Sequence, residues 1–317
     1  MPQPTSSDVH VNRPLTTISV AYLQDQDEFI ADKVFPNVPV TKKSDSYFIY
    51  PKGQWFRTDA KKRAPATESA GSGYPIETGT YAADVQALHK DVDDQIRSNA
   101  DQPINLDADA SEFVTRGLLL RKEKDFAAKY FKTSLWTGHA DYTPSPLWDG
   151  TNPTPIKNIR DIILAIKKVT GIRPNKFVLS EDVWNVIQDS ADFIDRIAYT
   201  ERKIVSVELL AAVLDIEKVL VAGAVENSAN EGATPTMASL FTKDCLLVYA
   251  APRPSLMLPS GGYTFSWTGY LGASPQGLRM KRFRMEPIAS DRVEGEMAYD
   301  QKVVATDLGC FFNNCIS

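Results

Sequence analysis

The chain has 317 residues, a hydrophobic content of 43% and a formal net charge of −5. This length is sufficient for two domains of ordinary size with a substantial core, and the acidic balance excludes a global basic field that would attract nucleic acid. The sequence contains no apolar run of about 18 residues, so no membrane-spanning segment is expected, and the N-terminus lacks the basic head and apolar core of a secretory signal.

The first 45 residues predict an N-terminal arm. They begin polar, and an amphipathic stretch follows at residues 18–30. The next stretch, VFPNVPV (Val34–Val40), is expected to be extended, because Pro36 and Pro39 lack amide donors and restrict their neighbours. Such a segment either stays loose or lies along another surface.

Residues 46–90 predict a long hairpin. Its outgoing arm carries aromatic residues from Tyr47 to Phe56, and its returning arm runs from Tyr74 to Leu88. The small, polar and glycine-containing segment at residues 59–73 is typical of a mobile tip. Because a two-stranded ribbon of this length is not stable alone in water, it needs a second surface, which a neighbouring chain can supply.

The charge of the hairpin differs from that of the segment after it. Residues 42–63 contain seven basic and two acidic residues, whereas residues 84–112 contain eight acidic and two basic residues. Opposite charges of this kind can meet within one subunit or between subunits, where they would set the register of assembly. The sequence leaves both alternatives open.

The strongest helix signal lies at residues 107–132. Asp109 and Glu112 have the spacing of a capping box, and basic residues accumulate in the later turns, which suits the helix dipole. One apolar row begins at Phe113 and a second contains Leu119, Phe126 and Tyr130. A helix of this length would be roughly 40 Å long, and its two rows indicate contact with other elements on two sides.

Residues 133–155, rich in Thr, Pro, Gly and Asp, predict an irregular connection between two domains. Residues 156–255 then alternate between helix and strand patterns, which predicts a compact α/β domain. We expect a helix at 158–171, strands at 176–179, 218–225 and 245–250, and helices capped by Ser180 and Ser206. Residues 263–317 have strand character.

The three cysteines, Cys245, Cys310 and Cys315, form no Cys-x-x-Cys pair. Their odd number fits a reducing compartment without an obligatory disulfide framework. Cys245 lies in the apolar run CLLVYA, which predicts a buried thiol. Packing is also the expected role of the other two, with a disulfide between subunits as the alternative.

The residues of a catalytic centre are missing. The only histidines are His10, His89 and His139, and none lies in the predicted α/β domain. Nucleophile, zinc-protease and phosphate-loop motifs are absent. We therefore expect no catalytic, cofactor-binding or metal-binding residues. The basic cluster at residues 61–63 is interpreted as a solvated or intersubunit tip, because no aromatic stacking partner lies beside it, and the cluster at 279–284 as a strand surface. Contact with nucleic acid is the alternative for both.

The order of these parts resembles the major capsid proteins of tailed bacteriophages. The stretches that carry the resemblance are FIADKVFPNVPV, DADASEFVTRGLL, TGIRPNKFVLSEDVWNVI, KVLVAGAVEN and EGEMAYDQKVVATDLGCFFNN. The resemblance implies an α+β, HK97-like shell fold. Its parts would be an N-terminal arm (1–45), an extended hairpin loop (46–90), a peripheral domain (91–155 and 263–317) with a spine helix (107–132), and an axial α/β domain (156–262).

The resemblance implies a structural, non-enzymatic protein of the virion that self-assembles, in the host cytoplasm, into an icosahedral shell around double-stranded DNA. Its partners would be copies of itself in hexamers and pentamers, with scaffolding, portal or decoration proteins as further candidates, and neither a cofactor nor a membrane. Residues expected at the subunit interface are Phe35, Trp55, Phe56, Arg57, Lys61, Lys62, Arg63 and Tyr74.

Some relatives cross-link their subunits by a Lys–Asn isopeptide bond. The nearest candidate residues in this chain are Lys61 or Lys62 with Asn313 or Asn314. Because no catalytic carboxylate for that bond can be identified, no cross-link is predicted. Two other functions remain alternatives: a small-molecule-binding α/β enzyme, and an accessory virion protein of the decoration or tail type.

Overall fold

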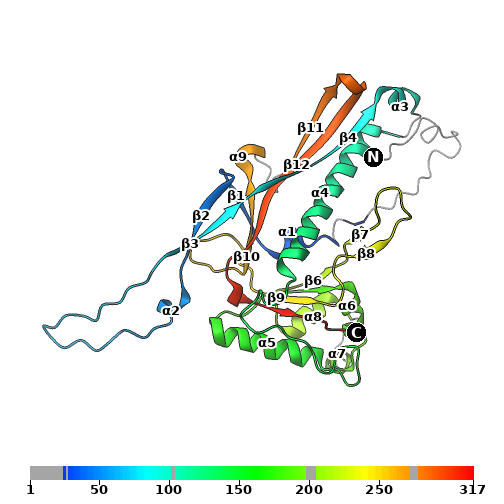
Figure 1. Cartoon of the computed structure of the whole chain (residues 1–317). Coiled ribbons are helices and arrows are strands. Elements are labelled where there is room, and N and C mark those ends of the chain that lie inside the picture. Colours follow the sequence, from blue (N-terminus) through cyan, green and yellow to red (C-terminus); the bar gives the residue numbers. More distant parts are fainter. Residues whose placement is uncertain (1–23, 26–27, 101–103, 198–204, 272–277) are drawn as a thin grey trace.

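The computed structural model describes residues 24–25, 28–100, 104–197, 205–271 and 278–317. A long sheet and an α/β domain are joined by one long helix, α4 (Figure 1). Most of the expected amphipathic stretch at residues 18–30 lies outside the described residues.

The long helix α4 spans Leu106–Tyr130. It begins earlier than the predicted capping box, because the side chain of Asn105 accepts a hydrogen bond from the amide of Ala108 and caps the helix there. The prediction of a capping box at Asp109 was therefore wrong, although the long helix itself is confirmed. Phe113, placed in a buried row by the sequence pattern, is 60% exposed.

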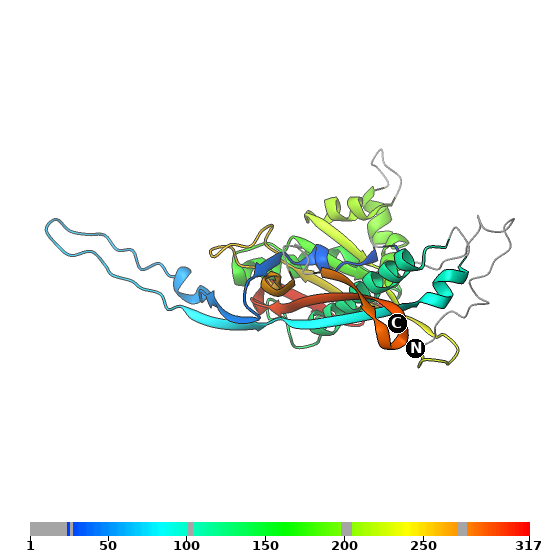
Figure 2. The same cartoon turned by 90° about the horizontal axis from the view of Figure 1, so that it is seen from above.

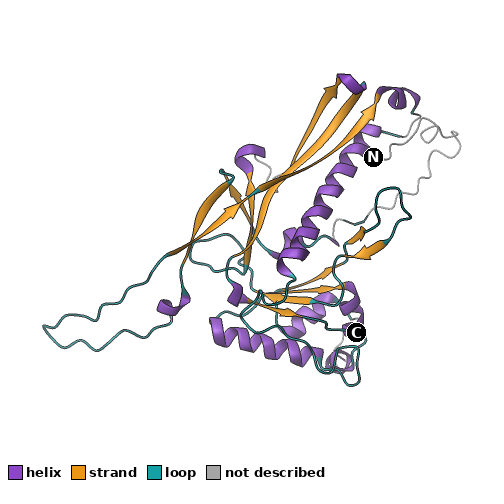
Figure 3. Ribbon diagram, viewed as in Figure 1, coloured by secondary structure: helices purple, strands orange, loops and turns teal. Residues whose placement is uncertain are grey.

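The long sheet lies beside α4 (Figure 3). Its central strand β12 pairs with β11 and β4 along its first part and with β10 along its last part, and β10 pairs in parallel with β1. Val114 and Leu118 of α4 pack against this sheet. Gly295 of β12 permits the close approach, because a Cβ atom there would lie 2.5 Å from Cγ1 of Val114. The strands are β1 (Asn37–Val40), β4 (Asp84–Asp93), β10 (Gly262–Trp267), β11 (Leu278–Met285) and β12 (Ser290–Val303).

The α/β domain has a sheet with the strand order β13-β9-β5-β6. Ser180 and Ser206 cap helices as predicted, each accepting a hydrogen bond from an amide three residues later. Gly171 ends α5 in the left-handed conformation, with φ of 73°. The elements are β5 (Lys176–Ser180), β6 (Lys218–Ala222), β9 (Cys245–Val248), β13 (Gly309–Phe312), α5 (Pro155–Thr170), α6 (Glu181–Gln188), α7 (Ala191–Ile197) and α8 (Val207–Leu214).

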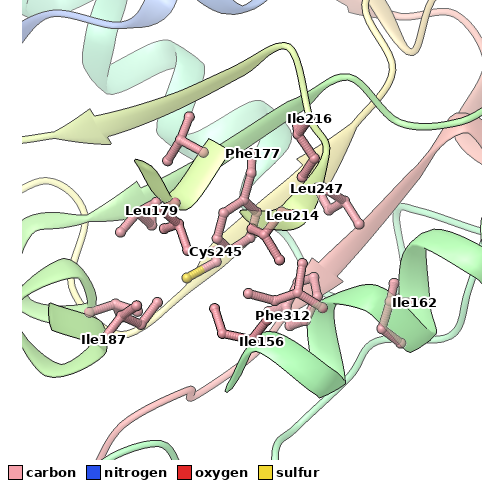
Figure 4. Close-up of a cluster of buried hydrophobic side chains, with 14 of the residues drawn as sticks. Ile156, Ile162, Phe177, Leu179, Ile187, Leu214, Ile216, Cys245, Leu247 and Phe312 are labelled. Atoms are coloured by element: carbon pink, nitrogen blue, oxygen red, sulfur yellow. The ribbon is translucent and has the colours of Figure 1, made fainter. Parts of the chain in front are cut away.

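Both faces of this sheet are buried. Helices α5 to α8 cover one face. There, Ile156 and Ile162 of α5 lie in one apolar cluster with sheet residues that include Phe177, Cys245 and Phe312 (Figure 4). The other face receives the end of α4 and the short helix α1 (Ala31–Val34). Burial on both faces explains why the strands of this sheet are almost uninterrupted apolar runs instead of alternating sequences.

The last strand, β13, differs from the expected domain boundary. The sequence placed all of residues 263–317 with the peripheral strands, but Gly309–Phe312 pairs with β9 inside the α/β sheet. The connection before α5, which the sequence also assigned to the peripheral domain, contributes Trp148 to the core of the α/β domain. The chain therefore crosses between the long sheet and the α/β domain again after β12.

The remaining elements are short. A small hairpin is formed by β7 and β8. Among the described residues, no helix combines the length and the apolar character that crossing a membrane requires. The elements are β7 (Val225–Asn227), β8 (Met237–Ser239), α3 (Asp94–Asn99), α9 (Thr268–Leu271), and the 3-10 helices Glu286–Ile288 and Thr306–Leu308.

Gly269 provides a test of how the arm is held. A Cβ atom at Gly269 would lie 2.1 Å from the carbonyl oxygen of Thr41, directly after β1. We expect Gly269→Ala to force β1 away from α9 and to lower the free energy of unfolding by about 2 kcal/mol, measured by thermal unfolding. Gly53→Ala is the matched control, because a Cβ there has no neighbour within 4 Å. Equal stability of the two variants would contradict this packing.

Candidate functional site

The candidate site is a hairpin that leaves the body of the molecule. Strand β2 (Ser44–Ile49) pairs in antiparallel fashion with β3 (Glu77–Ala82). Between them the chain runs outward as an extended loop, interrupted by the short helix α2 (Lys52–Trp55). The loop projects away from the rest of the chain in both views (Figures 1 and 2).

The paired part of this hairpin is shorter than the sequence predicted. The returning arm was expected to run to Leu88, but β4 begins at Asp84 and pairs with β12 of the long sheet. The break falls at Ala83, which is fully buried. After Ala83 the chain continues as β4, which pairs with β12 instead of β2. The ladder between β2 and β3 therefore ends at Ser44 and Ala82.

Aromatic stacking attaches the hairpin to the body. The rings of Tyr47 and Tyr81, one from each strand, stack on Phe265 of β10 with centroid distances of 5.6 and 4.6 Å. Tyr81 and Phe265 are buried. Offset ring pairs of this kind add stabilisation beyond the apolar area that they bury, so the direction in which the loop leaves the body is fixed at its base.

The projecting part exposes large aromatic side chains. Trp55 packs on Tyr74 across the two arms, with a centroid distance of 5.1 Å, but these side chains remain 51% and 53% exposed. Phe56 is 65% exposed. Apolar surface of this extent on a projecting loop is typical of a protein–protein contact. Within one chain, this surface remains in water.

A crevice lies between the base of the hairpin and the body. Its volume is about 900 Å³, and its walls include residues 47–52, 55 and 56 of the hairpin, the loop 254–260 and residues 304–308. Lys52 and Asp307 bridge it with an ion pair of 2.6 Å. The walls are mainly apolar, and the loop side adds the exposed residues Leu256 and Met257.

The basic residues predicted for the interface lie on the loop. Arg57, Lys61, Lys62 and Arg63 are all exposed. Asp59 accepts a hydrogen bond from Ser72, which joins the two arms near the tip. No ion pair of Lys61 or Lys62 with another described residue is found.

Phe35 requires a correction. The sequence placed it at the subunit interface, but it is 1% exposed and packs on Phe126 and Tyr130 at the end of α4. Its side chain belongs to the core of its own subunit. The arm segment that carries it therefore lies along the body of the molecule, while the other seven predicted residues lie on the projecting loop.

The acidic segment after the hairpin finds its partners elsewhere. Asp91 and Asp94 pair with Arg292 and Arg284 from β12 and β11 at 2.7 and 2.5 Å. The basic cluster of β11 is neutralised by these and neighbouring carboxylates, including Glu296. Lys43 and Asp84 form the contact between the two oppositely charged segments, at 3.6 Å. Because its charges are compensated within the subunit, β11 is a poor surface for phosphate groups.

Two neighbouring buried residues of α4, one acidic and one basic, anchor the arm, and the sequence did not predict them. Glu123 of α4 is fully buried and accepts hydrogen bonds from the amides of Ile30 and Ala31, at 3.1 and 2.8 Å. These amides are at the start of α1, whose N-cap residue Ile30 offers no capping side chain. Glu123 thus caps a helix from outside it. Its neighbour Lys122, also buried, pairs with Asp32.

The environment of Glu123 changes its acidity. Burial raises the pKa of the carboxyl to about 7, and this outweighs the two amide donors, which lower it. The charged groups facing it are Asp32 of α1, which raises the pKa, and Lys122, which lowers it. A helix sequence with Lys and Glu side by side is typical of a solvated face, so the sequence offered no signal for this burial.

The described residues show no candidate metal site. They contain no group of three or more His, Cys, Asp or Glu side chains arranged to bind a metal ion. His10 lies outside the described residues, while His89 lies on β4 and His139 in the connection before α5. The chemistry that the geometry supports is association through exposed apolar and basic side chains.

Comparison with known proteins agrees with this architecture. The chain is 25% identical over 324 residues to the major capsid protein of Pseudomonas phage JBD67, with 97% of each chain covered. It is 24% identical over 219 residues to the major capsid protein of Burkholderia phage BcepMu, covering 68% and 69% of the two chains. No family model matches the sequence.

Solved structures show the same arrangement. A phage-related protein from Bordetella bronchiseptica RB50 superposes with a TM-score of 0.70 at 20% identity, covering 92% of this chain and 94% of the other. The capsid of cyanophage P-SCSP1u gives a TM-score of 0.58 at 11% identity, with 93% and 90% covered. The chain has the phage-capsid fold. The α+β shell fold expected from the sequence is thus confirmed.

The phage-capsid fold occurs outside phages as well. An encapsulin complex from Synechococcus elongatus PCC 7942 matches with a TM-score of 0.52 at 10% identity, covering 95% and 94% of the chains. The two sequence relatives, however, are both phage major capsid proteins. Fold and sequence relatives together support a structural shell protein, and neither supports the enzyme or the accessory virion protein.

The raised pKa of Glu123 gives a pH dependence with a definite sign. Between pH 4.5, its ordinary pKa, and about 7, the folded chain retains a proton that the unfolded chain has lost. The contribution of this carboxyl to the free energy of unfolding therefore falls as pH rises through that window, by on the order of 3 kcal/mol. We expect Glu123→Gln to remove this part of the pH dependence in denaturant unfolding.

Glu112→Gln is the matched control on the same helix, because Glu112 is partly exposed and pairs with Arg116 on the helix surface. This variant should keep the pH profile of the original chain. A Glu123→Gln profile that still falls between pH 4.5 and 7 by the original amount would contradict the assignment.

Proposed function

We propose that this protein is a major capsid protein that assembles in many copies into the closed icosahedral shell of a tailed phage, around its double-stranded DNA. The observation that carries the proposal is the projecting hairpin with its exposed aromatic and basic residues. Apolar side chains on a loop that contacts so little of its own chain need a second chain to exclude water from them.

The proposed interface consists of Trp55, Phe56 and Tyr74 with the basic residues Arg57, Lys61, Lys62 and Arg63. Copies of this chain are the proposed partner, arranged in hexamers and pentamers. The aromatic residues would supply the buried contact, and the basic residues would orient the loop on an acidic surface of the neighbour. Phe35 is not part of this interface.

The proposal extends to the role of the domains. The α/β domain would surround the symmetry axis of each capsomer, and the long sheet with α4 would form the periphery. A structural role without an enzymatic activity follows, and the protein would reside in the virion after assembly in the host cytoplasm. Scaffolding, portal and decoration proteins are further proposed partners.

Limited proteolysis tests the role of the hairpin. Unassembled subunits should be cut between residues 59 and 73, because this segment is exposed and has few contacts. Assembled particles, recognised by electron microscopy, should protect the same segment. A monodisperse monomer that resists cleavage there, and that forms no particles, would contradict the proposal.

Charge reversal tests the basic residues separately. The double variant Lys61→Glu with Lys62→Glu should unfold within about 0.5 kcal/mol of the original chain, because both side chains are exposed. Its yield of closed particles should fall strongly, measured by sedimentation and electron microscopy. The control Lys61→Arg with Lys62→Arg retains the charge and should assemble normally. Normal assembly of the reversed variant would exclude these residues from the interface.

A further inference from the structure

The C-terminal tail closes over the core of the α/β domain. Strand β13, which pairs with β9, ends at Phe312, and after it Asn314 has the left-handed conformation, with φ of 50°. The amide of Cys315 donates to the carbonyl of Lys243 at 2.8 Å, and its carbonyl accepts from the amide of Trp148 at 2.9 Å. The third residue from the end of the sequence is thereby fully buried.

This turn brings two thiols together. The Sγ atom of Cys315 lies 3.8 Å from Sγ of Cys245, the first residue of β9, and both side chains are fully buried in one apolar cluster. Cys310, which faces the same cluster from β13, instead places its Sγ 3.7 Å from the carbonyl oxygen of Ala140. Of the three cysteines, Cys245 and Cys315 are therefore the pair in van der Waals contact.

We propose that Cys245 and Cys315 are a latent disulfide, which forms when the protein passes from a reducing to an oxidising medium and then locks the C-terminal tail onto the α/β sheet. The inference rests on the contact between the two thiols and on the path of the tail. It does not depend on assembly into a shell. It also replaces the disulfide between subunits that was considered for Cys310 and Cys315, because both of these thiols are buried.

The bond forms by exchange with a low-molecular-weight disulfide. The Cys315 thiolate attacks one sulfur of that disulfide, forming a mixed disulfide and releasing one small thiol. The Cys245 thiolate then attacks Sγ of Cys315 and releases the second small thiol. Two electrons pass from the protein to the small disulfide, and the two protons lost by the cysteines end on the two thiols released.

The structure also explains why the thiols stay reduced until the tail opens. Burial raises the pKa of the Cys245 thiol well above its ordinary value, so the reactive thiolate is scarce in the closed state. Beyond Cys315, the tail is held by packing of Ile316 on the core and by two hydrogen bonds from Ser317 to Asp149, one of them from the amide at 2.9 Å. Opening the tail at Cys315 also breaks the hydrogen bonds of its backbone to Lys243 and Trp148, but none of the pairs between β13 and β9. Local opening of this short segment exposes Cys315 without unfolding the sheet.

The disulfide would connect residues 70 positions apart. Closing a loop of that length removes conformational freedom from the unfolded chain, and the folded geometry already places the sulfur atoms close together. The oxidised chain should therefore unfold at a temperature several degrees higher than the reduced chain. The added stability would appear in the α/β domain, where both cysteines lie.

The test uses the full-length protein and oxidised glutathione. After incubation, quenching with an alkylating agent and peptide mapping by mass spectrometry, we expect one linked peptide that contains Cys245 and Cys315. Cys310→Ser should give the same link and the same rise in unfolding temperature. Cys315→Ser should show neither, and its reduced form serves as the reference for any change in folding.

The rate provides a second measurement. Asp149→Asn weakens the anchor of Ser317 while leaving β9 and β13 intact, so oxidation should become several times faster. An unchanged rate would overturn opening of the tail as the route. Free Cys245 and Cys315 after prolonged oxidation, a link that includes Cys310, or a link between chains would each overturn the proposal.

Discussion

Helix α4 is packed between two sheets, and the arrangement of the whole subunit depends on that shared burial. Its earlier part packs on the long sheet through Val114 and Leu118, and its last turns place Phe126 and Tyr130 against the sheet of the α/β domain. Each sheet would otherwise expose an apolar face to water. Because one rigid helix covers both, the orientation of the long sheet relative to the α/β domain is fixed by side-chain packing along its length.

The same helix fixes the position of the arm on the subunit. Glu123 and Lys122 are buried where α1 crosses α4, and each satisfies a polar partner on the arm. Burial of charged groups is costly unless they are paired and hydrogen-bonded, and the observed position of the arm gives Glu123 and Lys122 these partners. Phe35, a few residues later, fills the remaining space against Phe126 and Tyr130. The described part of the arm from residue 28 on is thereby part of the subunit core, whereas the loop after β2 projects away from it (Figures 1 and 2).

The distribution of charge and apolar surface follows from these constraints. The acidic residues beside α3 are neutralised by arginines of β11 and β12, which leaves that end of the long sheet electrically compensated. Lys52 at the base of the hairpin loop pairs with Asp307, but the basic residues farther out, at positions 57 and 61–63, form no ion pair with another described residue. The aromatic residues of the proposed interface are at least half exposed. Within the described residues, this projecting loop thus combines unpaired basic residues with exposed aromatic side chains, as expected for an element that associates with another chain.

The sequence by itself determined the local elements. Apolar periodicity and capping residues placed α4, α5, β5, β6 and β9 to within a few residues, and the Pro and Gly content predicted the extended arm and the open tip of the hairpin. It also predicted the extended hairpin, on which seven of the eight residues proposed for the interface lie.

Tertiary structure alone decided which strands pair and which charges are buried. Strand β4 leaves the hairpin for β12, and β13 joins β9, because backbone hydrogen bonds form with whichever strand is adjacent in space. Burial of Phe35 and Glu123 has the same origin. Each of these side chains is enclosed by elements distant in sequence, and local patterns carry no information about such neighbours.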